Sequence, residues 1–260
     1  MKLGISTACT YPEHTENAIK RLCENGVSNI EIFFNSACET EGKIFSEIVR
    51  IVRANGTNVT SIHPFTSGFE PFMLFSDYDR RFEDGRQYLN RYYDCANALG
   101  ADIVVLHGDR ADRQNHDDRY IERYHNLYTA ARKKGVYLAQ ENVSRCRSKD
   151  LEFIKRMKAQ LADDVRFVLD FKQARRSEVS FESLADAMAE KIIHLHINDY
   201  DENHDCLLAG QGVCDFNAAI EYLTEKGFKG SGVIEVYRQN YGQFEELLDS
   251  LKFLEKSLKI

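Results

Sequence analysis

The sequence has only three prolines, Pro12, Pro64 and Pro71, and no low-complexity linker that would divide it into domains. No apolar run approaches the length that spans a membrane. The seven cysteines are odd in number and form no CxxC pair, which excludes a regular disulfide framework and a zinc ribbon. Positive charge is also in deficit, because 34 basic residues oppose 41 acidic ones and leave a net charge of −7. We therefore expect neither nucleic acid nor a membrane as a partner.

Motifs for nucleotide binding are missing as well. The turn after the first predicted strand, GISTACTYPEH, contains no GxGxxG and no P-loop. The chain begins with MKLGIST, which enters a strand pattern at once and lacks the basic and apolar regions of a targeting signal. We expect a cytoplasmic enzyme, because the scattered cysteines suit a reducing compartment and the net charge is negative.

What the sequence does contain is a regular alternation of strand-like and helix-like segments. Amphipathic stretches separate short runs rich in Val, Ile, Leu and Phe, and four of these stretches end in a glycine suited to a helix C-cap. Strict alternation implies parallel strands with right-handed crossovers, and eight repeats favour a closed barrel over an open doubly wound sheet. We predict an α/β fold in which residues 1–260 form a single (β/α)8 TIM-barrel domain. The predicted strands are 3–6, 29–34, 59–63, 102–107, 136–141, 166–170, 192–197 and 232–236.

Four predicted strands in the second half of the chain deliver a side chain that can bind a metal near their carboxyl end. VYLAQE ends in Glu141, VRFVLD in Asp170, KIIHLH in His196 and GVIE in Glu235. The carboxyl ends of barrel strands are where barrel enzymes place their chemistry. Three carboxylates and one imidazole suit Mn²⁺, Mg²⁺ or Co²⁺ and tolerate Zn²⁺. We predict that these four residues hold one divalent metal ion.

The alternative is that these acids are separately solvated or paired with Arg145, Lys172 or Arg175. That explanation suits one carboxylate better than a set distributed over successive strands. A bound metal ion would polarise the carbonyl and adjacent hydroxyl of a sugar and ease removal of a proton from carbon. Glu141 and Glu235 would then be the catalytic pair, one removing the proton and the other returning it.

Other polar residues are predicted near the same end of the barrel. His63 and His107 end the third and fourth strands at matching depth, which suits substrate hydroxyls or a second metal, and Glu31 on the second strand could orient one of them. Arg145 and Lys172 would form an anion pocket. The predicted substrate-binding residues are His63, His107, Arg145, Lys172, Gln173 and His194. His194 shares a strand face with the second histidine of HLH, and for this residue the sequence favours a core position with satisfied hydrogen bonds.

Residues 64–81 form a longer connection than a barrel needs. They carry Phe65, Phe69, Phe72 and Phe75. An aromatic loop at the mouth of the barrel could act as a lid or a platform for a sugar. The alternative is a loop that packs on neighbouring helices or on a second subunit.

Several segments in order along nearly the whole chain resemble the xylose isomerase-like barrel superfamily, which includes sugar phosphate isomerases/epimerases, ketose epimerases, inosose dehydratases and endonuclease IV. These segments are IHPF, VLHGD, AQENVSR, VLDFKQARR, HLHIND, LLAGQG and VIEVY. The resemblance implies a TIM barrel whose metal ligands match Glu141, Asp170, His196 and Glu235. These are the same four residues that the strand ends indicate.

The sequence departs from the family pattern at three positions. Gln173 and Cys206 stand where family members often carry a histidine, and a three-metal nuclease site needs both. Arg147 stands where ketose epimerases carry an acidic residue that helps to bind the sugar. The reversed charge indicates a substrate with a phosphate or carboxylate group.

Together these features predict a metal-dependent isomerase or epimerase of a small polyhydroxy carbonyl compound, with or without a phosphate group, that acts through an enediolate. An inosose-type dehydratase would use the same metal and the same acids. Cleavage of phosphodiesters in the manner of endonuclease IV is disfavoured by the net charge and by the missing histidines. A non-catalytic ligand-binding barrel stays open, because fold does not fix function. A homo-oligomer stays open too.

Overall fold

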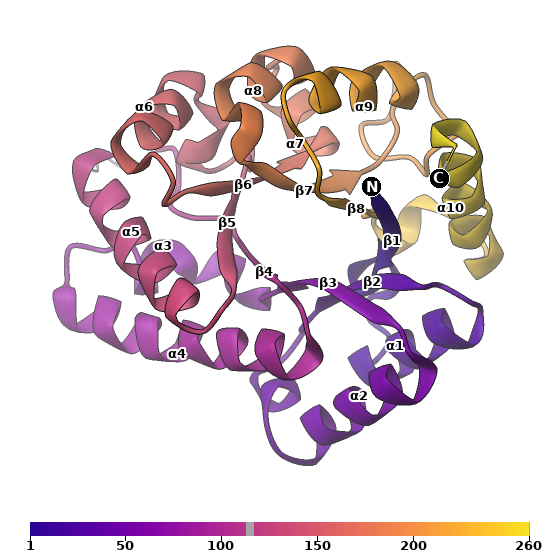
Figure 1. Ribbon diagram of the computed structural model, residues 1–260, viewed down its shortest axis with the longest axis horizontal. Helices are drawn as coiled ribbons and strands as arrows, with labels where there is room; N and C mark the ends of the chain where they lie inside the picture. The colour runs from indigo at the N-terminus through magenta and orange to yellow at the C-terminus, as the bar shows by residue number, and fades with distance from the viewer. Residues whose placement is uncertain (113–116, 260) are drawn as a thin grey trace.

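The computed structural model describes residues 1–112 and 117–259, and these form a closed barrel of eight parallel strands surrounded by helices (Figure 1). The strands pair in the order of the sequence, and β8 closes the barrel by pairing with β1. The strands are β1 (Lys2–Ser6), β2 (Asn29–Phe33), β3 (Asn58–His63), β4 (Ile103–Leu106), β5 (Tyr137–Glu141), β6 (Arg166–Asp170), β7 (Ile192–Ile197) and β8 (Ser231–Ile234). The predicted TIM barrel is therefore confirmed, and each predicted strand overlaps one of these.

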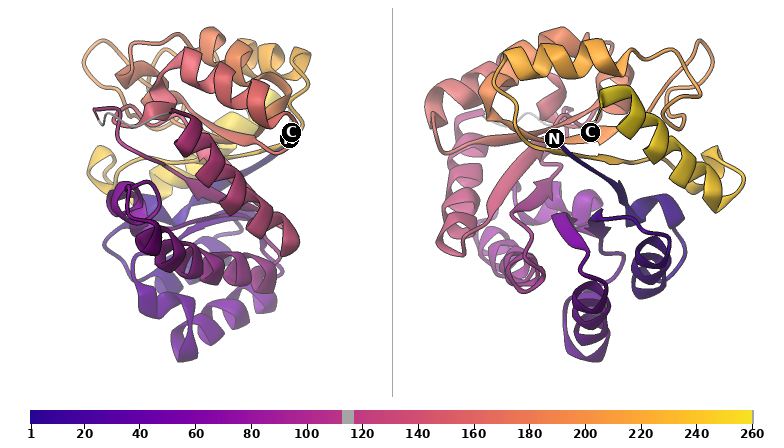
Figure 2. Two further views of the ribbon diagram at one scale, coloured as in Figure 1. Left: turned by 90° about the vertical axis from the view of Figure 1, so that its left-hand side faces the viewer. Right: turned by 45° about the vertical axis from the view of Figure 1, so that its right-hand side comes forward.

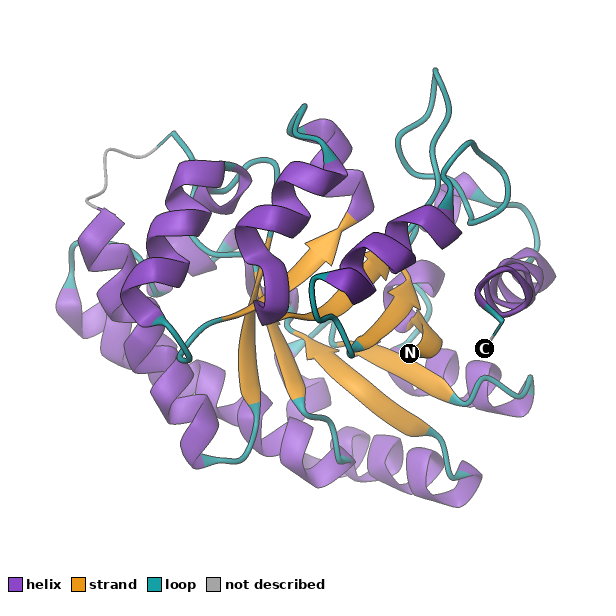
Figure 3. Cartoon of the chain, turned by 45° about the horizontal axis from the view of Figure 1, so that its top comes forward, coloured by secondary structure: helices purple, strands orange, loops and turns teal. Residues whose placement is uncertain are grey.

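The helices cover the outside of the barrel, as the cartoon and the side views show (Figures 2 and 3). The N-terminus and the end of the last helix lie close together in each view (Figure 2). The helices are α1 (Thr15–Glu24), α2 (Gly42–Asn55), α3 (Glu70–Met73), α4 (Asp79–Leu99), α5 (Asp117–Lys133), α6 (Leu151–Leu161), α7 (Phe171–Arg176), α8 (Phe181–Met188), α9 (Phe216–Glu225) and α10 (Phe244–Leu258). Among the described residues, no helix is both long and apolar enough to cross a membrane.

Helix ends behave as the glycine pattern predicts. Gly56 caps α2 with φ 64° and Gly100 caps α4 with φ 73°. This left-handed conformation strains residues with a Cβ but not glycine, so the chain can turn sharply into the next strand. Repetition of this device brings each strand back beside the previous one.

Alternate residues of each strand face two different compartments. On β4, Val104 and Leu106 belong to the large apolar cluster between barrel and helices. Ile103 and Val105 instead contribute to a small apolar cluster with Ala139 and Val168 inside the barrel. Because this inner cluster is small, much of the barrel interior is left to polar side chains.

The connection after β3 divides into a buried part and an exposed part. Phe75 is 2% exposed and stacks on Tyr120 with ring centroids 4.2 Å apart. Phe69 and Phe72 are 61% and 55% exposed. The packing interpretation therefore describes Phe75, whereas Phe69 and Phe72 stay available to a ligand or a partner.

Candidate active site and metal centre

Glu141, Asp170, His196 and Glu235, here called the mouth cluster, converge inside the carboxyl end of the barrel. Nδ1 of His196 lies 3.5 Å from Oε1 of Glu141 and 3.5 Å from Oε2 of Glu235. It lies 3.7 Å from Oδ2 of Asp170, its neighbour in the β6–β7 ladder. One ligand atom from each residue falls within 4.8 Å of all the others. The structure thus brings together the four residues that the sequence predicts as metal ligands.

Three atoms of the mouth cluster lack hydrogen bonds. Nδ1 of His196, Oδ2 of Asp170 and Oε2 of Glu141 are buried and have no hydrogen-bond partner among the described residues. An unsatisfied buried polar atom is costly, and native proteins seldom retain one without a reason. A cation between the three carboxylates and the imidazole would offer these atoms a partner. The donor set of oxygens with one nitrogen fits a divalent ion such as Mn²⁺, Mg²⁺, Co²⁺ or Zn²⁺.

The ionisation of the mouth cluster follows from burial and from its neighbours. Burial alone would raise the pKa of Glu141, but the electrostatic interaction with His107 and the hydrogen bonds from nearby histidines hold this pKa well below its usual range. The pKa of Glu235 is likewise lowered against burial by Lys172 and His196. Burial dominates at Asp170 and raises its pKa.

The pKa of His196 is raised, in contrast to the lowered pKa values of Glu141 and Glu235. Burial lowers the pKa of His196, but the charges of Glu235 and Glu31 outweigh burial and raise this pKa well above its usual range. Without a metal ion, a proton on His196 therefore supplies part of the positive charge that the carboxylates attract.

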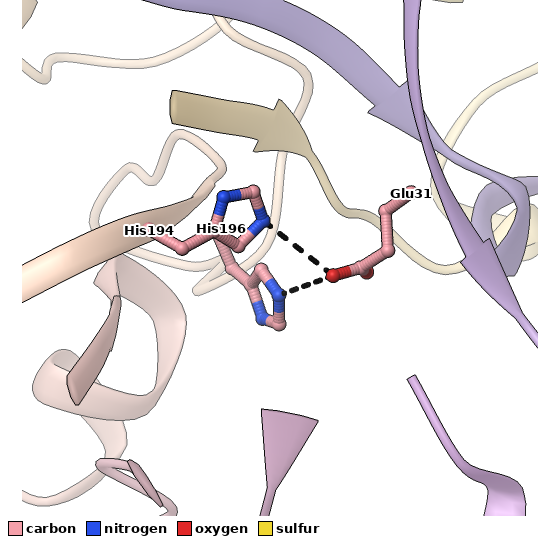
Figure 4. A group of neighbouring side chains, drawn as sticks. All are labelled: Glu31, His194 and His196. Carbon is pink, nitrogen blue, oxygen red and sulfur yellow. Dashed lines mark hydrogen bonds and ion pairs between the residues drawn. The ribbon is translucent and has the colours of Figure 1, made fainter. Parts of the chain in front are cut away.

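The carboxylate of Glu31 faces the rings of both His194 and His196 (Figure 4). Its Oε2 lies 3.2 Å from Nε2 of His196 and 3.5 Å from Nε2 of His194. Nε2–H of His196 is thus donated to Glu31, and Nδ1 is left to face the carboxylates, the arrangement by which an outer carboxylate fixes a metal-binding imidazole. Glu31 lies in the middle of β2 and faces β7, so the expectation that it orients His63 or His107 is wrong.

Beneath His196 lies a second polar group, here called the inner cluster: Ser6, Glu31, Ser61, His194 and Ser231. Ser6 and Ser61 donate hydrogen bonds of 2.9 and 2.8 Å to the two carboxylate oxygens of Glu31. His194 is fully buried, with Nδ1 2.8 Å from Oγ of Ser231 and Nε2 3.1 Å from Oγ of Ser61. With both ring nitrogens engaged, the geometry of His194 favours the core interpretation over substrate binding.

His63 and His107 form a pair beside Glu141. Nδ1 of His63 lies 3.0 Å from the carbonyl oxygen of Pro64, which requires a proton on Nδ1 and leaves Nε2 as an acceptor in the neutral ring. Arg145 donates to Nδ1 of His107 at 3.2 Å, so the proton of His107 is on Nε2. That Nε2 lies 2.7 Å from Oε2 of Glu141 and 2.9 Å from Nε2 of His63. His63, His107 and Glu141 are also close enough to hold a metal, so both roles predicted for these histidines stay open.

Lys172 and Gln173 follow Asp170 on α7 and lie in the same region. The Lys172 ammonium is 3.0 Å from Oε2 of Glu235 and 3.4 Å from Oδ2 of Asp170, and its side chain is only 4% exposed. Oε1 of Gln173 accepts the backbone N–H of Ser144 at 3.0 Å. Gln173 thus ties the loop after β5 to α7, while Lys172 contacts the mouth cluster directly.

Sequence reasoning missed Glu70, which lies in the connection after β3. Glu70 is 3% exposed, and its carboxylate accepts the backbone N–H groups of His107 and Gly108 at 2.9 and 2.6 Å. It therefore fixes the backbone that carries His107. An acidic residue amid the aromatic residues of this connection is the one signal in the sequence that could have indicated this role.

Arg147 does not face the mouth cluster as its place in the sequence suggested. Its guanidinium group forms an ion pair with Asp117 on α5 and lies over the ring of Phe153. Asp117 neutralises the charge that indicated an anionic substrate. The argument for an acidic substrate from Arg147 therefore fails.

A family model, described as the xylose isomerase-like TIM barrel, matches residues 19–257. The chain belongs to this family. No curated protein resembles it closely enough in sequence to count as a match.

Several solved structures superpose on nearly the whole chain at low sequence identity. A D-tagatose 3-epimerase-like protein is 18% identical with a TM-score of 0.79, covering 100% of this chain and 97% of its own. D-psicose 3-epimerase from Clostridium cellulolyticum H10, solved with D-tagatose, is 17% identical with a TM-score of 0.80, covering 99% of both chains. An IolI protein with a bound zinc atom is 19% identical with a TM-score of 0.75, covering 99% of this chain and 96% of its own. At these identities the likeness establishes the fold alone.

Proposed function

We propose that this protein is a divalent-metal-dependent isomerase or epimerase of a small polyhydroxy carbonyl compound, free or phosphorylated. The observation that carries the proposal is Nδ1 of His196, which faces the carboxylates of Glu141, Asp170 and Glu235 and makes no hydrogen bond with any described residue. Membership of the xylose isomerase-like family and the sugar epimerases among its structural neighbours support the same reaction class.

Glu141, Asp170, His196 and Glu235 would hold the metal ion. The ion would act as a Lewis acid toward the carbonyl and adjacent hydroxyl oxygens of the substrate and so make the intervening C–H bond more acidic. Glu31 keeps the imidazole in the tautomer that exposes Nδ1. Glu70 and Arg145 position His107.

Glu141 and Glu235 would transfer the proton. One carboxylate removes it from carbon to give an enediolate, and the other, after it takes up a proton from solvent, delivers that proton to the opposite face of the same carbon or to the neighbouring carbon. The first outcome is epimerisation and the second is aldose–ketose isomerisation. His63 and His107, next to Glu141, would bind substrate hydroxyl groups and keep that carboxylate ionised.

A nuclease function in the manner of endonuclease IV finds less support. Gln173, at one of the two positions where the family histidines are missing, uses its side-chain oxygen for the N–H of Ser144. The other position, Cys206, is 1% exposed, and burial raises the pKa of its thiol, which disfavours a thiolate ligand.

The test is conversion of a panel of aldoses, ketoses and their phosphates by protein loaded with Mn²⁺, Mg²⁺, Co²⁺ or Zn²⁺, in deuterated water. NMR should detect an isomer or epimer that carries solvent deuterium at the exchanged carbon, unless the transferred proton is shielded. A chelator should abolish the conversion. Elimination of water from a cyclic polyol would instead identify a dehydratase, and no conversion with any of the metals would count against an enzyme of either kind.

A further inference from the structure

We infer that Lys172 makes the mouth cluster selective for a carboxylate-bearing substrate, such as a sugar acid or a polyhydroxy keto acid. The inference rests on the proposed function, since it names the class of substrate for the same site. It is carried by the position of the Lys172 ammonium group and by the charges around it.

The ammonium group of Lys172 lies within the mouth cluster rather than at its rim. It contacts the same oxygens of Asp170 and Glu235 that face Nδ1 of His196. The ring of Tyr237 lies 5.0 Å away and covers it from another side. A substrate that contacts Glu235 during proton transfer must therefore pass within reach of this ammonium group.

Lys172 offsets part of the negative charge that the carboxylates bring to the site. Four carboxylates, those of Glu31, Glu141, Asp170 and Glu235, stand against the cationic side chains of Lys172 and Arg145. A divalent ion cancels the remaining two negative charges. Without Lys172 the loaded site would carry a net negative charge and repel an anionic substrate.

Binding of a metal ion also frees Lys172 for another partner. Once Asp170 and Glu235 share their charge with a divalent ion, the buried ammonium group loses part of its pairing, and a buried charge needs a partner. Among the described residues, the ammonium group donates one hydrogen bond, to Glu235, although it has three N–H groups. A substrate carboxylate would provide both the charge and the acceptor.

A single negative charge fits better than the double charge of a phosphate. Lys172 is the buried cation at this site, whereas Arg145 is exposed and contacts His107, and two further guanidinium groups nearby are paired with acids. Arg147 is paired with Asp117, and Arg176 is paired with Asp205. A carboxylate brings one negative charge, which a single ammonium group can pair, whereas a phosphate brings up to two.

The experiment compares two non-reacting ligands that differ only at one carbon, D-gluconate and D-glucitol. Their affinities for the Mn²⁺-loaded protein are measured by calorimetry in the wild type and in Lys172→Gln. The wild type should prefer gluconate by roughly tenfold or more, the scale of one hydrogen bond to a charged group. Lys172→Gln should reduce this preference by roughly tenfold, the part that the ammonium group contributes.

Arg175→Gln is the matched control. It removes a cation from the same helix, but the Arg175 side chain lies against the ring of Tyr200 and donates to the carbonyl of Asp201. This variant should keep the wild-type preference. Equal affinities for both ligands in the wild type, or an unchanged preference in Lys172→Gln, would overturn the inference.

Mn²⁺ affinity provides a second readout that does not depend on turnover. Because the ammonium group repels a nearby cation, Lys172→Gln should bind Mn²⁺ roughly tenfold more tightly than the wild type. Loss of Mn²⁺ binding in this variant would mean that Lys172 is needed to build the site, and would also overturn the inference. Failure of the sugar panel alone would reject the proposed function but leave the gluconate preference standing.

Discussion

The inner cluster and the mouth cluster are both built from buried acids and histidines, but they differ in how completely their hydrogen bonds are satisfied. In the inner cluster, Ser6, Ser61 and Ser231 occupy the oxygens of Glu31 and both ring nitrogens of His194. In the mouth cluster, Nδ1 of His196 and Oδ2 of Asp170 have no hydrogen bond with any part of the chain that the structure describes. A network with all its hydrogen bonds made stabilises the fold. Buried polar atoms without hydrogen bonds indicate that a ligand binds there.

His196 connects the two clusters, because its Nε2 belongs to the inner one and its Nδ1 to the mouth. Its neighbour two residues earlier, His194, has the same chemistry but belongs to the inner cluster alone. The pair shows that residue type does not decide which cluster a histidine joins in this barrel. Depth along the strand and the presence of serine hydroxyls do.

The largest effect should come from replacing a proton carrier in the mouth cluster. Glu141→Gln and Glu235→Gln should each lower turnover of the sugar that the wild type converts by roughly 100-fold or more, the scale of a lost general acid or base. Loss of metal would mimic this result, so Mn²⁺ content is measured in the same samples. A glutamine variant that keeps its metal and turns over at a near wild-type rate would show that the replaced glutamate does not carry the proton.

A smaller effect is expected when the inner cluster is altered at the point where it supports the mouth. Glu31→Gln removes the carboxylate that accepts the proton of Nε2 of His196, and should weaken Mn²⁺ binding by roughly 10- to 100-fold. Calorimetric titration measures the affinity, and circular dichroism confirms folding. The matched control is Glu47→Gln, an exposed glutamate that pairs with Arg50 on α2. If Glu31→Gln binds Mn²⁺ as tightly as the control, the two clusters are not coupled through His196.

Mn²⁺ binding should release a proton from the mouth cluster but not from the inner cluster. The raised pKa of His196 means that the metal-free protein holds a proton there, and Mn²⁺ must displace it. Below this folded-state pKa, each unit of rising pH should therefore increase Mn²⁺ affinity by about tenfold. For the metal-free protein the sign reverses: the stability contributed by protonated His196 is complete below the unfolded pKa and is lost as pH rises through the folded pKa.

Titrations in buffers of different ionisation enthalpy count the protons released per ion. His194 provides the contrast, because burial lowers its pKa and leaves it no proton to release. Affinity for Mn²⁺ that stays constant between about pH 6 and 8 would show that His196 carries no displaceable proton.

The sequence could predict the site residues that lie at the carboxyl ends of strands. Glu141, Asp170 and His196 lie on three successive strands, and parallel pairing places their carboxyl ends together whatever the exact register. Glu235 follows the same logic, although β8 ends one residue earlier, at Ile234. Glu31 could not be placed in this way. Its partner His196 is 165 residues away, and they meet only because the closed barrel points β2 and β7 into one interior.

Residues in connections were also beyond prediction. Glu70 reaches the backbone of His107 from a short helix whose position depends on tertiary packing. Arg147 seemed to face the substrate because of its spacing from Glu141, but its charge is taken by Asp117 on another helix. Neither pairing leaves a periodic signal in the sequence, because loop conformation has none.

The smallest expected effect tests whether the inner cluster is structural. Ser6 is fully buried and donates to Oε1 of Glu31 at 2.9 Å, so Ser6→Ala leaves a carboxylate oxygen without that donor. Chemical denaturation should show a loss of about 1.5 kcal/mol in the free energy of unfolding, the lower end of the range for a hydrogen bond to a charged group. Ser46→Ala is the matched control, because the Ser46 hydroxyl on α2 bonds to the carbonyl of Gly42 at an exposed position and should matter less.

Mn²⁺ affinity should change little in either variant, since Ser61 and the two histidines still hold the other oxygen of Glu31. If Ser6→Ala instead weakens Mn²⁺ binding as much as Glu31→Gln while the free energy of unfolding stays the same, the inner cluster serves the metal site rather than the fold, and the distinction between the two clusters fails.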